Sequence, residues 1–181
     1  MATARTLILM RHAEAGGGAR DHDRPLTPDG ARDAAAAGEW IRAAMSPVDA
    51  VLCSTARRTR QTLEQTRIEA ATTFADELYG GGVGDILEQV RLLPESARTA
   101  LVIGHAPGIP SVAFELATVA EQEDDQIDAN PDGDDGPPPQ PELQALRSFS
   151  ACTLAVLRTD AGWDQLAERG ASLVTVRRPD R

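Results

Sequence analysis

The sequence predicts an α/β fold, a three-layer sandwich in which a mostly parallel central sheet carries helices on both faces. Short, wholly apolar runs, typical of strands buried on both faces, alternate with longer segments of helical pattern. The chain has 181 residues, 41% of them hydrophobic and 25% charged. That length and composition suit one domain with its own core. We therefore expect a single domain over residues 1–181.

Apolar runs and residues that favour strands mark the expected strands. The three runs predicted as buried strands are Thr6–Met10, Asp49–Cys53 and Ala100–Ile103. Further, weaker strand candidates toward the C-terminus are Phe149–Leu157, Trp163–Arg169 and Leu173–Val176.

Four helices are predicted between these strands. Thr27 and Pro28 provide an N-cap and a first helical position, and Pro94 lies just beyond the end of a later apolar pattern of helical spacing. The predicted helices run from Pro28 to about Ala44, from Ser54 or Thr55 to about Arg67, over Val83–Leu93, and from about Pro107 to Ala120.

Most of the excess negative charge of the chain lies in one segment. The formal net charge is −10, yet nine of the 28 acidic residues fall between Glu121 and Glu142 with no basic residue among them. The remaining 19 acidic residues nearly balance the 18 basic ones. Residues 121–141 also contain five prolines, so we expect a mobile acidic insertion within one domain rather than a linker. It serves either as a solubilising loop or as a strip that attracts basic partners.

The composition excludes several function classes. Every basic residue is Arg, so Schiff-base chemistry on Lys and a P-loop lysine are excluded. Aromatic residues make up only 3%, which disfavours a stacking surface for single-stranded nucleic acid. Cys53 and Cys152 lie in apolar runs and are expected to be buried free thiols, too few for a zinc site. The sequence shows neither a signal peptide nor a membrane-span pattern, so we expect a soluble cytoplasmic protein.

Polar residues follow the three predicted buried strands. Arg11 and His12 end the first, and His105 ends the third. The second leads into a helix whose first turns carry three arginines, namely Arg57, Arg58 and Arg60. Parallel strands end at the same edge of a sheet, where ligands bind in open α/β folds. Forked Arg donors match phosphate oxygens, so we expect a site for a phosphoryl group.

The surrounding charges suit His12 as a nucleophile. Neighbouring arginines disfavour a second proton on its imidazole, and a nucleophilic imidazole must be neutral. Phosphoryl transfer depends mainly on positioning and charge neutralisation, which these side chains can supply without a metal. His22, the third histidine, stands in a polar loop without the partners that a metal site needs.

Four motifs resemble those of the histidine phosphatase (phosphoglycerate mutase-like) superfamily. They follow one another in the order and spacing of that family, and the match extends to about residue 120. The segments that carry it are Leu7–Glu14, Arg24–Gly30, Ser54–Thr62 and Val102–His105. The short length and the turn after Arg24 are most similar to the SixA-type phosphohistidine phosphatases.

This resemblance implies a role for each matching residue. His12 would take the phosphoryl group, while Arg11, Arg58 and His105 would hold its oxygens. Water would then hydrolyse the phosphohistidine, with no cofactor and no metal. The motif selects Arg58, whereas helix geometry alone leaves Arg57 and Arg58 open. Ala13 departs from the family, because many members have Gly at this position.

The general acid is the weakest part of the pattern. Larger members of the superfamily supply a Glu from a lid before the third strand. Here the span Ile68–Thr99 is short and largely taken up by one predicted helix, which leaves little material for a lid. Glu77 is the best-placed candidate, with Asp76 beside it. A surface carboxylate that caps the following residues is an equally good interpretation of Glu77.

These features favour a metal-independent phosphatase that acts on protein phosphohistidine. An open site with a weak acid suits an imidazole leaving group better than an alkoxide. The alternatives are a phosphatase of a small ester, such as a sugar or nucleotide phosphate, and a non-catalytic phosphate-binding module. We expect a phosphorylated protein or small ester as the substrate, no nucleic-acid or membrane partner, and a monomer.

Overall fold

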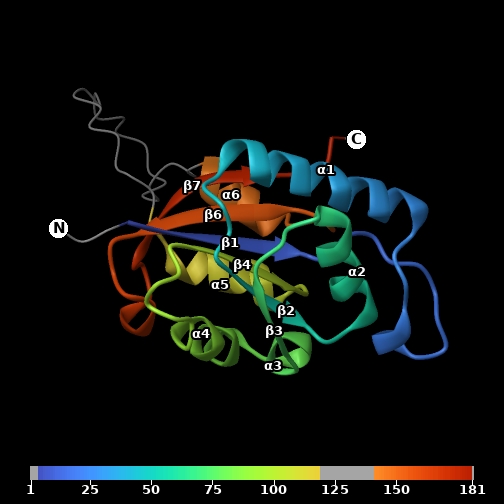
Figure 1. The fold of residues 1–181 in the computed structure, drawn as a ribbon, viewed down its shortest axis with the longest axis horizontal. Helices are drawn as coiled ribbons and strands as arrows, with labels where there is room; N and C mark the ends of the chain where they lie inside the picture. The colour runs from blue at the N-terminus through green and yellow to red at the C-terminus, as the bar shows by residue number, and fades with distance from the viewer. Residues whose placement is uncertain (1–3, 119–140, 181) are drawn as a thin grey trace, which may run out of the picture.

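The central layer of the protein is one seven-stranded sheet. The computed structural model describes residues 4–118 and 141–180. The strands are β1 (Arg5–Arg11), β2 (Ala50–Ser54), β3 (Ala71–Ala75), β4 (Thr99–Gly104), β5 (Ala117–Thr118), β6 (Leu154–Thr159) and β7 (Ala171–Arg177). They lie in the order β3-β2-β4-β1-β6-β7-β5 (Figure 1).

Half of this sheet is purely parallel. Strand β1 pairs in parallel with β4, β4 with β2, and β2 with β3. Strand β6 runs antiparallel to both of its neighbours, β1 and β7, and the short β5 is parallel to β7. The three predicted buried strands thus lie side by side and end at one edge.

Helices cover both faces of the sheet, which confirms the predicted three-layer architecture. The α-helices are α1 (Pro28–Ala44), α2 (Arg57–Thr66), α3 (Glu77–Gly80), α4 (Val83–Arg91), α5 (Gly108–Leu116) and α6 (Pro141–Arg147), and the 3₁₀ turns are η1 (Asp21–Asp23) and η2 (Trp163–Gln165). Helices α1 and α2 pack on one core, while α3 to α6 pack on the other. In Figure 1, α1 lies above the sheet and α4 below it.

Local sequence signals set several of these boundaries. The Thr27 hydroxyl accepts a hydrogen bond from the backbone N–H of Gly30, and Pro28 occupies the first helical position of α1. Residues Leu7 to Met10 of β1 are almost completely buried, because helices cover both faces of that strand. Cys53 and Cys152 are buried, as predicted, and neither forms a disulfide within the described residues.

Some predicted elements were wrong. The structure contains β3 and α3 within a span that the sequence assigned largely to one helix. Strand β3 was missed because four of its five side chains are exposed, so its pairing with β2 depends on backbone hydrogen bonds rather than on an apolar pattern. Trp163–Gln165 forms a 3₁₀ turn instead of a strand. The strand predicted from Phe149 begins only at Leu154.

Two other expectations concern the acidic insertion and the absence of a membrane span. Residues 121–140 of the acidic insertion lie outside the described residues, and Pro141 is the first residue of α6. Among the described helices, none combines the length and the apolar character that a membrane span requires.

Candidate active site

The pairing of β1 with β4 brings two histidines together. Arg11 is in register with Gly104, and the backbone N–H of His12 donates to the Gly104 carbonyl at 2.9 Å. His12 and His105 each follow the last residue of their strand. Their ring centroids are therefore only 5.1 Å apart.

Arg58 joins the two imidazoles from the first turn of α2. Its Nε donates to Nε2 of His12 at 3.3 Å, and its Nη2 lies 3.2 Å from Nδ1 of His105. The side chain is only 7% exposed. A further contact ties α2 to the residue after the first histidine, because the backbone N–H of Ala13 donates to the Thr62 hydroxyl at 3.0 Å.

The partners of His12 define its proton position. Nδ1 lies 2.7 Å from the carbonyl oxygen of Ala13, which can only accept a hydrogen bond, so Nδ1 carries the hydrogen. The lone pair of the neutral ring is then on Nε2, the atom that receives the Arg58 Nε–H. The nitrogen available for attack therefore faces the guanidinium group.

His105 takes the opposite arrangement. Arg58 donates to its Nδ1, so the hydrogen resides on Nε2, which lies 2.8 Å from the Ser54 hydroxyl oxygen. Ser54 is the last residue of β2 and is fully buried. The hydroxyl accepts from Nε2–H in this arrangement, and it could instead donate to a bare Nε2 once Arg58 no longer donated to Nδ1.

Both histidines are neutral at physiological pH. Burial, followed by the charges of Arg58, Arg11 and Arg24, lowers the pKa of His12 to about 4, although the hydrogen bond to Ala13 acts in the opposite direction. Burial, together with His12 and the neighbouring arginines, lowers the pKa of His105 to about 3. A neutral imidazole is the form that can act as a nucleophile.

Arg11 reaches the same region from the last position of β1. Its Nη1 donates to the Phe149 carbonyl at 2.9 Å, while its buried Nε has no hydrogen-bond partner among the described residues. Burial lowers the pKa of its guanidinium group. The positive charge of Arg11 contributes to the lowered pKa of both His12 and His105. Arg11 therefore adds a positive charge in the neighbourhood of both histidines.

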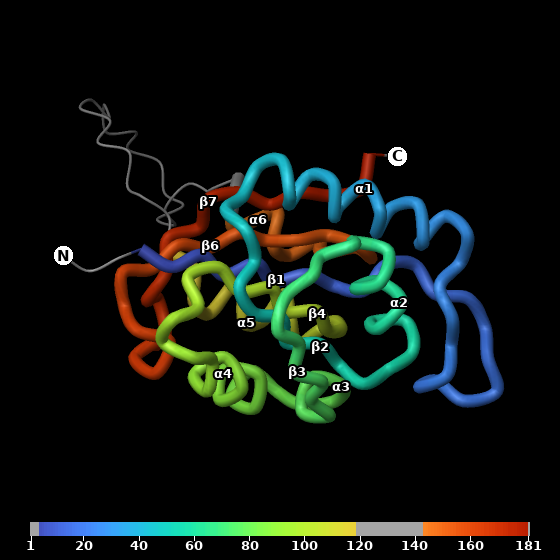
Figure 2. The backbone as a smooth tube through the Cα atoms, viewed as in Figure 1, coloured from blue at the N-terminus to red at the C-terminus, as the bar shows by residue number. Residues whose placement is uncertain are grey.

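Sequence reasoning missed two residues of this site, Asp21 and Tyr79. Asp21 belongs to the η1 turn in the loop between β1 and α1, which stands beside α2 in Figure 2. Its Oδ2 accepts from Nη2 of Arg58 at 3.0 Å and from the Tyr79 hydroxyl at 2.8 Å. The Tyr79 ring packs edge-on against His105, with centroids 5.3 Å apart. No local motif marks either residue, because Asp21 lies in a connection between β1 and α1 and Tyr79 in the four-residue helix α3.

Glu77 lies at the correct end of the sheet but outside this cluster. It is the first residue of α3, which follows the end of β3, and Tyr79 of the same helix contacts His105. Glu77 is exposed, and its carboxylate makes no hydrogen bond or ion pair within the described part of the chain. The neighbouring Asp76 accepts a hydrogen bond from the Thr55 hydroxyl.

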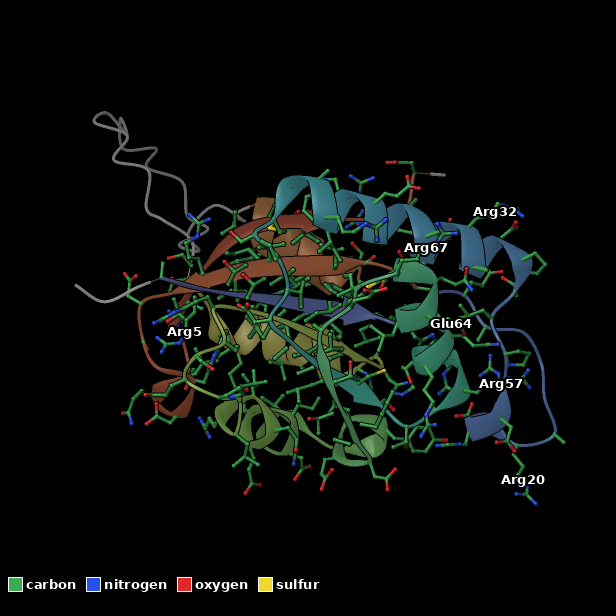
Figure 3. All side chains as sticks on the ribbon, in the orientation of Figure 1. Arg5, Arg20, Arg32, Arg57, Glu64 and Arg67 are labelled. Atoms are coloured by element: carbon green, nitrogen blue, oxygen red, sulfur yellow. The ribbon has the colours of Figure 1, made fainter. Side chains whose placement is uncertain are left out.

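The other polar candidates lie around the rim. Arg57 is exposed and Arg60 stacks over the Phe74 ring at 4.7 Å, so neither joins the histidines. Figure 3 shows Arg57, next to Arg58, at the same end of the molecule as Arg20, which precedes Asp21. Nε2 of His22 lies 3.2 Å from the Thr55 hydroxyl. Residues 4–118 and 141–180 contain no group of three or more His, Cys, Asp or Glu side chains that could hold a metal ion.

Comparisons with known proteins agree with this geometry. The family model of the histidine phosphatase superfamily (branch 1) matches residues 7–78. An uncharacterized protein of Mycobacterium tuberculosis is 46% identical over 113 residues, which are 61% of this chain and 72% of the relative. An uncharacterized protein of Mycobacterium leprae is 30% identical over 159 residues, or 88% and 89% of the two chains.

Solved structures give the same result over the full length. A protein of Nakamurella multipartitia, provisionally named phosphohistidine phosphatase SixA, superposes with a TM-score of 0.85 and 47% identity over 99% of both chains. The protein histidine phosphatase SixA in complex with tungstate superposes with a TM-score of 0.70 at 22% identity, over 96% of this chain and 97% of that one, and supports the fold alone.

The order of the strands, the two histidines at their ends and the close relatives lead to one assignment. The chain belongs to the histidine phosphatase superfamily, as a phosphatase of the SixA type.

Proposed function

We propose that this phosphatase hydrolyses phosphohistidine on proteins, without a metal, through a phosphohistidine intermediate on His12. One observation carries this proposal: the lone pair on Nε2 of the neutral His12 points at the Arg58 guanidinium, and the ring of His105 lies 5.1 Å from that of His12 between centroids. A nucleophile, a forked cation and a further imidazole thus surround one space.

In the first step, Nε2 of His12 attacks phosphorus and the bond to the leaving nitrogen of the substrate breaks. The Arg58 Nε–H, which donates to Nε2 in the structure, would then turn to a phosphoryl oxygen. In the second step, water attacks phosphorus, the bond to Nε2 breaks, and the proton that water loses leaves with phosphate or solvent. His12 regains its lone pair.

Three cationic or polar groups would hold the phosphoryl oxygens. Arg58 offers forked donors, and Arg11 offers a buried Nε–H without another partner. His105 would present Nδ1–H to an oxygen when the Ser54 hydroxyl donates to its Nε2. Such donors stabilise the charge that develops on the transferred group without a metal ion.

The substrate class follows from the weak provision for a general acid. Glu77 is the proposed acid, and its carboxylate is exposed rather than held against the histidines. An imidazole that already carries a proton leaves more readily than an alkoxide, so this arrangement suits phosphohistidine better than a small ester. The name of the similar protein of Nakamurella multipartitia supports the same substrate class.

A ratio of two rates tests the proposal. Phosphate release from a histidine-phosphorylated carrier protein is compared with release from an aryl phosphate, both in chelator, with His12→Ala as the blank. A large ratio and an inactive variant are expected. A ratio at or below one, with an inactive variant, would keep the chemistry but assign the site to small esters. Activity retained by His12→Ala would contradict the intermediate.

A further inference from the structure

Arg58 is a buried cation that needs a counter-ion before any substrate arrives. Its side chain is 7% exposed, and a buried charge without a partner is costly. Within the described residues its ion-pair partner is Asp21. The main-chain carbonyl of Asp21 accepts from Nη1 at 2.6 Å, and the carboxylate Oδ2 accepts from Nη2 at 3.0 Å.

The Asp21 carboxylate is itself fixed from three sides. Besides Arg58, the Tyr79 hydroxyl donates to Oδ2 at 2.8 Å and Nη1 of Arg24 donates to Oδ1 at 3.0 Å. These three donors hold the pKa of Asp21 well below its usual range. The group is therefore a permanent anion, unsuited to donate a proton, at the outer edge of the cation that would hold the phosphoryl group.

We propose that Asp21 is a positioning residue that acts as the resident counter-ion of the phosphate site. It holds the outer edge of Arg58, so that Nε and the inner Nη2 hydrogen face His12 and His105 before the substrate binds. It also weakens the binding of free phosphate, because the product must share Arg58 with a carboxylate. This inference rests on the part of the proposed function in which Arg58 holds phosphoryl oxygens.

Bound phosphate and the Asp21 carboxylate carry charges of the same sign. Phosphate bound at Arg58 carries negative charge within a few ångströms of Asp21, and like charges at that distance repel even in a polar medium. The carboxylate therefore makes Arg58 less attractive to an anion than an unpaired arginine would be. Asp21 therefore fixes the position of the Arg58 guanidinium and lets the phosphate product leave readily. The affinity of the site for phosphate is lower as a result.

The test measures the affinity of inorganic phosphate by calorimetry, which does not depend on turnover. Asp21→Asn keeps an oxygen that can accept from Arg58 but removes the charge, so phosphate should bind roughly five- to tenfold more tightly. Asp21→Glu keeps the charge and should remain close to the wild type. Asp23→Asn is the matched control, because its exposed carboxylate lies on the same turn and faces His22 at 3.7 Å.

Two further measurements make the result decisive. The gain in Asp21→Asn should shrink with added salt, and product inhibition by phosphate in an aryl phosphatase assay should become stronger by the same factor. Unchanged or weaker phosphate binding in a folded Asp21→Asn, or equal tightening in Asp21→Glu, would overturn the counter-ion role. A protein that binds phosphate as expected but does not hydrolyse phosphohistidine would contradict only the proposed substrate.

Discussion

Two neutral imidazoles beside three arginines define the chemistry at the scale of single residues. His12 and His105 have pKa values of about 4 and about 3, so both rings should stay unprotonated well below pH 6. Titration by NMR, with His12→Ala and His105→Ala to assign the signals, checks this. A ring that takes up its proton near pH 6.5 would show that burial and the arginines do not control it.

The forked shape of Arg58 should matter as much as its charge. Arg58→Lys keeps one positive charge but cannot contact His12, His105 and Asp21 together. We expect kcat to fall about 100- to 1000-fold, as for the loss of a donor that stabilises a transition state. Arg57→Lys is the control, because this exposed neighbour should tolerate the change. Similar losses in both variants would contradict the assignment of Arg58.

The proposed acid should matter only for a poor leaving group. Glu77→Gln is expected to lower the rate on an alkyl phosphate about 100-fold, since a general acid typically contributes at least this much. The rate on a histidine-phosphorylated protein should change by less than about threefold on the same grounds. Steady-state rates on both substrates decide the matter. Equal changes on the two substrates would remove Glu77 from the mechanism.

The contact of α1 with α2 governs the site at the scale of elements. A Cβ on Gly38 of α1 would come within 2.2 Å of the Thr66 carbonyl at the end of α2, the helix that carries Arg58. Gly38→Ala should therefore lower the free energy of unfolding by about 1–3 kcal/mol, the usual cost of overpacking. Urea unfolding measures this.

Gly84 of α4 provides the matched control for that substitution. A Cβ there would meet no atom within 4 Å. Gly84→Ala should leave stability unchanged or raise it by up to about 1 kcal/mol, because alanine loses less conformational entropy in a helix. A destabilised Gly84→Ala, or an unaffected Gly38→Ala, would contradict the close approach of α1 and α2.

The two histidines of the site also make the stability of the whole molecule depend on pH. Their pKa values in the folded state lie below that of an unperturbed histidine, about 6.5, so the unfolded chain binds more protons as the pH falls below that value. The free energy of unfolding should therefore be largest above about pH 6.5 and decrease toward pH 4. Denaturant unfolding at several pH values tests this, and His105→Asn should show a shallower decrease.

The predictable part of the molecule follows from its most apolar segments. The runs at β1, β2 and β4 are buried on both faces, so their pattern is unambiguous. By contrast, β3 pairs through its backbone and exposes most of its side chains, and α3 has only four residues. Neither element has a clear periodicity of apolar residues in the sequence. The role of the acidic segment and the extent of the single domain stay predictions.

The sequence by itself indicated which strands lie at the centre, and hence that His12, His105 and an arginine after β2 meet at one edge, because parallel strands end together. The resemblance to the family, not the geometry, selected Arg58 over Arg57. Only the tertiary structure decided which atoms face one another. Asp21 comes from the β1–α1 connection and Tyr79 from the short helix α3, and the positions of both depend on packing. The Ser54 hydroxyl contacts His105 only because β2 lies next to β4. Hydrophobic pattern encodes layers, whereas the placement of polar side chains depends on long-range contacts.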